Sequence, residues 1–169
     1  MRDAFGPARQ RLACGMDSHL DLAIKPIVAD PWVISSLLQK SIRRGETDIA
    51  RRSALTFCKL KGSAIWRRLM VIAFEDIGIG SVEAIIMTVA ASSDRDWRKG
   101  HGGDLRLAVH LATVLAEAAK DRSADYLCEA KDHPGLAGFA DAVAETSLER
   151  RLSHVHDQAL GLPQRAVAA

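Results

Sequence analysis

Apolar residues recur with helical spacing in this chain, and glycine closes successive stretches of them. In the clearest case Ile34, Leu38 and Ile42 follow one another every four residues, and Gly45 ends the segment. Such spacing places side chains on one face of an α-helix, and glycine is common just after a helix end. The pattern continues to Gly62, whereas no run of strand length is bounded by turn residues. Together with an aromatic content of only 5%, this predicts an all-α fold.

We expect about six or seven helices, packed into one compact bundle. Asp30 and Pro31 start the first helix, because an aspartate side chain caps free amides and proline needs no hydrogen bond at the first helical position. Ser63, Ser81 and Asp104 are placed to cap later helices. The expected helices cover residues 31–44, 46–61, 64–77, 82–91, 105–120, 123–131 and 136–152, and residues 92–104 form the longest expected loop.

One helical domain is expected to dominate the chain. Residues 1–30, interrupted by glycine and proline, are interpreted as an arm or a short helix, residues 31–160 as a single helical domain, and residues 161–169 as a frayed tail. The longest apolar runs are far shorter than the roughly 18 to 20 residues that cross a bilayer, so we expect no membrane association and no secretory leader. The three cysteines are widely separated, which favours a reducing, cytoplasmic location.

The common catalytic signatures are missing from the sequence. It contains no GxxxxGK[ST] phosphate-binding loop, no HExxH, no GxSxG and no complete GxGxxG. We therefore expect no enzymatic activity, no catalytic residue, no metal and no cofactor. A metal-dependent helical phosphohydrolase stays open as an alternative, because His110, His133, His156 and Asp157 are residue types that bind metal ions in such enzymes.

Positive charge is concentrated in one part of the chain. Residues 31–72 carry nine basic and two acidic side chains, a net charge of +7, although the whole chain carries only +2. Such a segment is suited to neutralising the phosphates of DNA, and the candidate contacts are Lys40, Arg43, Arg44, Arg51 and Arg52. The alternatives are ordinary solvated helix faces, or a protein-interaction adaptor that docks on an acidic partner without binding nucleic acid. Trp32 and Trp66, which lie near these basic residues, are expected in the core.

A second informative segment, WRRLMVIAFEDIGIGSVEA, covers residues 66–84. Glu75 and Asp76 end an apolar helix just before Gly78, and acidic residues at a helix C-terminus oppose the helix dipole. A local rule broken in this way calls for a compensating partner, such as Arg67, Arg68 or a backbone amide. We interpret these five residues as a structural or oligomerisation motif and not as a catalytic pair.

Three segments, in order, resemble the C-terminal helical domain of the MgsA/RarA-type replication-associated recombination AAA+ ATPases. They are LLQKSIRRGETDIA (37–50), RRLMVIAFEDIG (67–78) and LAVHLATVLAEAAKDRSADYL (107–127), and the resemblance extends over about residues 35–130. It implies a collar-like helical domain, similar to that of clamp loaders, that assembles into a homotetramer. It also implies action at damaged replication forks, with DNA, single-strand-binding protein and, since the ATPase module is not among these residues, a separate ATPase subunit as possible partners.

Overall fold

The chain folds into two compact units, residues 1–121 and residues 122–169, and each is described by itself. The structure, a computed structural model, describes residues 4–16, 24–130 and 133–168. The described residues contain helices and no strand, so the predicted all-α class is confirmed. Among these residues every helix is too short or too polar to traverse a lipid bilayer.

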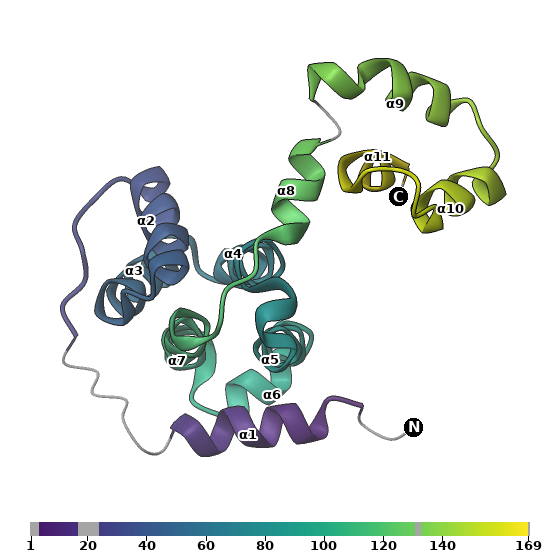
Figure 1. Cartoon of the computed structure of the whole chain (residues 1–169). Coiled ribbons are helices and arrows are strands. Elements are labelled where there is room, and N and C mark those ends of the chain that lie inside the picture. The colour runs from purple at the N-terminus through teal and green to yellow at the C-terminus, as the bar shows by residue number, and fades with distance from the viewer. Residues whose placement is uncertain (1–3, 17–23, 131–132, 169) are drawn as a thin grey trace. The chain divides into compact units, whose positions relative to one another are not determined.

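The first unit consists of seven α-helices and two tighter turns within its described residues (Figure 1). In chain order they are α1 (Gly6–Met16), α2 (Pro31–Arg44), α3 (Thr47–Lys61), α4 (Ala64–Ile72), the π-helical turn η1 (Ala73–Ile77), the 3-10 turn η2 (Gly78–Ser81), α5 (Val82–Ser92), α6 (Arg95–Gly100) and α7 (Gly103–Glu117). The second unit comprises α8 (Ser123–Ala130), the 3-10 turn η3 (Pro134–Leu136), α9 (Ala137–Ala144), α10 (Leu148–His156) and α11 (Leu162–Ala168).

Helix α2 begins and ends where the sequence predicts. The carboxylate of Asp30 accepts a hydrogen bond from the amide of Trp32 at 2.8 Å, which caps the first turn. At the other end Gly45 adopts φ 73°, and its amide donates to the carbonyl of Ile42. This left-handed glycine turns the chain directly into α3, which packs against α2.

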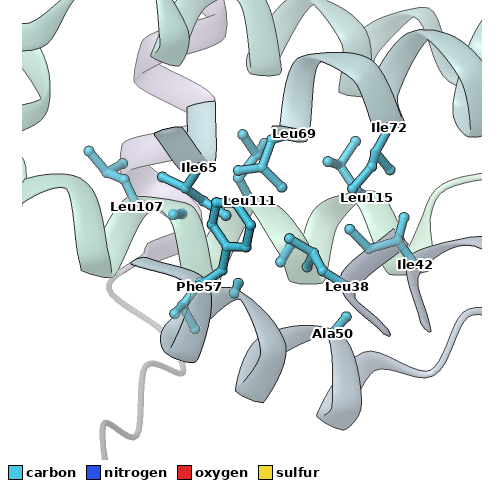
Figure 2. Close-up of a cluster of buried hydrophobic side chains, with 14 of the residues drawn as sticks. Leu38, Ile42, Ala50, Phe57, Ile65, Leu69, Ile72, Leu107, Leu111 and Leu115 are labelled. Carbon is cyan, nitrogen blue, oxygen red and sulfur yellow. The ribbon is translucent and has the colours of Figure 1, made fainter. Parts of the chain in front are cut away.

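The core of the first unit is built around α7, which contacts α2, α3, α4 and α5. Figure 2 shows its leucines pointing toward apolar side chains from three other helices. The labelled residues are Leu107, Leu111 and Leu115 of α7, Leu38 and Ile42 of α2, Ala50 and Phe57 of α3, and Ile65, Leu69 and Ile72 of α4. Buried alanines on α7 let α3 approach closely, as the small-residue face of this segment predicts.

The expected loop at residues 92–104 is instead a short helix, α6. Asp94 caps it by accepting a hydrogen bond from the amide of Trp97 at 2.9 Å. The buried Arg98 then fixes the helix, because Nη1 donates to the carbonyl of Ala91 at 2.8 Å and Nε donates to Asp104 at 2.6 Å. Asp104 therefore binds a side chain and does not cap α7, which was the wrong part of the prediction at this position.

The second unit departs from the prediction in three respects. The expected single domain over residues 31–160 is divided after Asp121, because the helices that follow pack mainly on one another. The expected helix at 136–152 is broken between α9 and α10, where Ser147 caps the new helix by accepting from the amide of Arg150. The expected frayed tail forms α11, which packs against α8, α9 and α10.

Candidate nucleic-acid interface and its buried anchor

The carboxylate of Asp76 is fully buried and is held by side chains from α2. Its Oδ1 accepts a hydrogen bond from Arg43 Nε at 2.6 Å, and its Oδ2 accepts one from Gln39 Nε2 at 2.9 Å. The expectation that Arg67 or Arg68 compensates this charge is therefore wrong for the direct partner. Two donors, one of them cationic, satisfy an acid that lies in a π-helical turn and has no access to solvent.

The Gln39 side chain links the rest of the motif to Asp76. Its amide nitrogen also donates to Glu75 at 3.0 Å, and its oxygen accepts a hydrogen bond from Arg68. Arg67 is exposed and has no ion-pair partner in the part of the chain that the structure describes. Our sequence reasoning missed Gln39, although its position four residues before Arg43 places both on one edge of α2.

The segment after α7 closes over the same turn. The amide of Asp121 donates to the carbonyl of Ile77 at 3.0 Å. Gly78 has φ 50°, and a Cβ there would collide with the carbonyl oxygen of Asp121, so this position requires glycine. Lys120 Nζ donates to the carbonyl of Ala116 at 2.8 Å; burial lowers the pKa of Lys120, and the negative charge of Asp76 acts in the opposite direction.

Residues from all three segments that carried the resemblance thus meet at one place. Gln39 and Arg43 come from residues 37–50, Asp76 from residues 67–78 and Asp121 from residues 107–127. Because Asp76 is buried and its oxygens accept hydrogen bonds from neighbouring side chains, the cluster is built to hold helices together and not to act on a substrate.

The five basic residues proposed for DNA contact have different environments. Lys40 and Arg44 are exposed, and neither has an ion-pair partner among the described residues. Arg43 is engaged by Asp76, and Arg52 donates to the carbonyl of Lys25 at 3.0 Å and lies 3.6 Å from Asp48. Arg51 is half-buried, and its charge contributes to lowering the pKa of His110 on α7. Lys40 and Arg44, one helical turn apart on α2, are therefore the pair best placed to meet a phosphate backbone.

The outer face of α2 also carries a hollow of about 410 Å³, lined by Trp32, Val33, Ser36, Leu37 and Lys40. Trp32 is 85% exposed, so its expected place in the core is wrong, whereas Trp66 is 5% exposed and confirms the expectation. The helical period explains the difference, since Trp32, Ser36 and Lys40 form a stripe opposite the buried Ile34 and Leu38.

The residues considered for a metal site do not converge. His110 belongs to the first unit, and His133, His156 and Asp157 belong to the second. Across residues 4–16, 24–130 and 133–168, no group of three or more histidine, cysteine, aspartate or glutamate side chains is arranged to hold a metal ion. His133 instead accepts a hydrogen bond from the amide of Gly135, which starts η3.

Comparison with known proteins adds no relative to this picture. No protein-family model matches the chain, and a search of curated proteins finds no match.

Proposed function

We propose that this protein is a non-catalytic, DNA-associated oligomerisation module of a cytoplasmic replication or recombination factor, similar to the C-terminal domain of the MgsA/RarA-type ATPases. The observation that carries the proposal is that the fold does not consume the positive charge of residues 31–72. Only Arg43 is committed to the buried Asp76, while Lys40 and Arg44 on the same helix stay exposed. An unpaired basic face of this kind favours a phosphate backbone as partner.

Charge reversal at Lys40 and Arg44 tests the DNA part of the proposal. Labelled single-stranded and forked DNA are titrated with wild-type protein and the K40E/R44E double variant, and binding is followed by fluorescence anisotropy at two salt concentrations. We expect weaker binding by the variant and a flatter salt dependence, by roughly 0.7 log units per lost contact with single-stranded DNA. R95E/K99E, which changes the same charge at exposed positions of α6, is the control. Equal loss in both variants, or in neither, contradicts the assignment.

Exposed apolar side chains support the oligomerisation part. Phe74, expected in the core, is 49% exposed, and Ile79, Val82 and Ile86 are exposed along η2 and α5. Burying such side chains between copies of the chain is favourable. Light scattering on the same samples tests the assembly: an oligomer, a homotetramer by the resemblance, is expected, and a monomer at all micromolar concentrations contradicts it.

The same apolar side chains keep one alternative in view, namely an adaptor that docks on a protein partner without binding nucleic acid. A well-behaved oligomer with no affinity for either DNA probe would favour this alternative. In the preferred reading the partners are DNA, single-strand-binding protein and a separate ATPase subunit.

A further inference from the structure

The indole ring of Trp32 is the most exposed tryptophan ring among the described residues. Trp66 is buried under Arg98, whose guanidinium carbon lies 4.6 Å from the ring centroid, and Trp97 stacks on His101 with centroids 4.5 Å apart. Trp32 makes neither kind of contact, although its backbone is fixed in the first turn of α2 by the Asp30 cap. The fold therefore holds a large planar apolar group in water without using it internally.

The hollow beside this ring combines apolar and cationic groups. Val33 and Leu37 supply an aliphatic wall, Lys40 lies at one end, and no carboxylate lines it. Eight residues of helix separate Trp32 from Lys40, so the ring and the ammonium are about 12 Å apart along the axis. A planar base on the ring and a phosphate of the same strand near Lys40 match this arrangement of stacking surface and charge.

We propose that Trp32 stacks on an unpaired base, and that the module therefore prefers single-stranded to duplex DNA. This inference rests on the proposed function. In a duplex both faces of each base are covered by neighbouring bases, so a protruding ring gains contact only if it unstacks a step. A single strand offers its base faces freely, and a base stacked on an aromatic side chain contributes affinity that does not depend on sequence.

Two substitutions at Trp32 separate stacking from charge. Binding of fluorescein-labelled twelve-nucleotide oligo-dT and of a twelve-base-pair duplex is measured by anisotropy for wild type, W32A and W32F. We expect W32A to bind oligo-dT about tenfold more weakly and the duplex within about twofold of wild type, and W32F to keep most of the oligo-dT affinity. Because the side chain is exposed, neither change should disturb the fold, which circular dichroism verifies. L60A, which shortens an exposed side chain of α3, is the control.

Tryptophan emission gives a second readout. Unlabelled oligo-dT should quench the emission of wild type, and W32F should lose most of this quenching because Trp66 and Trp97 are covered. Wild-type oligo-dT affinity in W32A overturns the inference, as does equal loss for single-stranded and duplex probes. A changed oligomeric state in W32A with DNA binding intact also overturns it, since the face is then a protein contact.

The two proposals fail in different ways. If wild type binds neither probe, the proposed function fails and the stacking role fails with it. If K40E/R44E loses affinity while W32A does not, the DNA-binding face stands and only the role of Trp32 is wrong.

Discussion

The side chain of Asp76 carries a charge that the fold removes entirely from water, so Arg43 and Gln39 must replace its hydration. D76N keeps the shape but leaves Arg43 without its counter-ion and turns one acceptor into a donor. Breaking a buried ion pair costs about 3–5 kcal/mol, and because the Arg43 side chain is 35% exposed we expect about 1–3 kcal/mol here. Urea unfolding measures the loss. E75Q is the control, since Glu75 is only half-buried, and an equal effect of the two changes would contradict the central place of Asp76.

His110 gives the stability of the first unit a dependence on pH. Burial lowers the pKa of His110 below its usual value of 6.5, and the charges of Arg106 and Arg51 lower it further. Below about pH 6.5 the unfolded chain therefore binds more protons at this position than the folded chain, so stability falls as the pH drops from that value toward the folded pKa. Urea midpoints between about pH 7.5 and about pH 5.5 should decline more steeply for wild type than for H110Q. Parallel curves would show that His110 does not contribute.

At the scale of elements, the turn between α4 and α5 depends on Gly78. G78A combines a positive φ of 50° with a collision against the Asp121 carbonyl, whereas G62A meets a positive φ of 55° with nothing within 4 Å of the added Cβ. We expect about 1 kcal/mol of destabilisation for G62A from backbone strain alone and at least about 2–3 kcal/mol for G78A. Urea denaturation of both variants makes the comparison, and similar losses would mean that the η1 turn yields to the added methyl group.

The helices that the sequence predicts well are those whose ends are marked locally. Asp30, Pro31 and Gly45 define α2 by caps that need no tertiary partner. Helix α6 was missed because it depends on the long-range contacts of Arg98. Phe74 was misplaced for another reason: the π-helical turn takes more residues per turn than an α-helix, which shifts the apolar stripe and turns the ring outward.

The candidate site was predictable in composition but not in assignment. The basic segment and the Glu75-Asp76 pair could be found by residue type and spacing. Which arginine binds Asp76 could not, because Arg43 reaches it across 33 positions of sequence. Trp32 was within reach of the helical period, since it lies on the polar side of α2, but the general tendency of tryptophan to be buried misled the prediction.

For the whole molecule, the division after Asp121 predicts independent folding of the first unit. Its continuous core extends from Leu12 to Ala116, so the fragment 1–121 contains every residue of that core. We expect this fragment to be helical and to unfold cooperatively, with a stability within about 0.5 kcal/mol of the corresponding transition of the full chain. Circular dichroism during urea titration measures both. A fragment without a cooperative transition would show that residues 122–169 are required for folding.

The hydrogen bond from the Asp121 amide to the Ile77 carbonyl has a mechanical consequence. The next residue, Arg122, belongs to the second unit, so a pull transmitted along the chain from that unit reaches the first unit at this bond. The bond lies on the turn that contains Asp76, and Asp76 is tied through Arg43 to α2, the helix that carries Lys40 and Trp32. Tension on the C-terminal unit is therefore applied to the charged anchor of the outer face, and the linkage works as a tether whose load point is the π-helical turn.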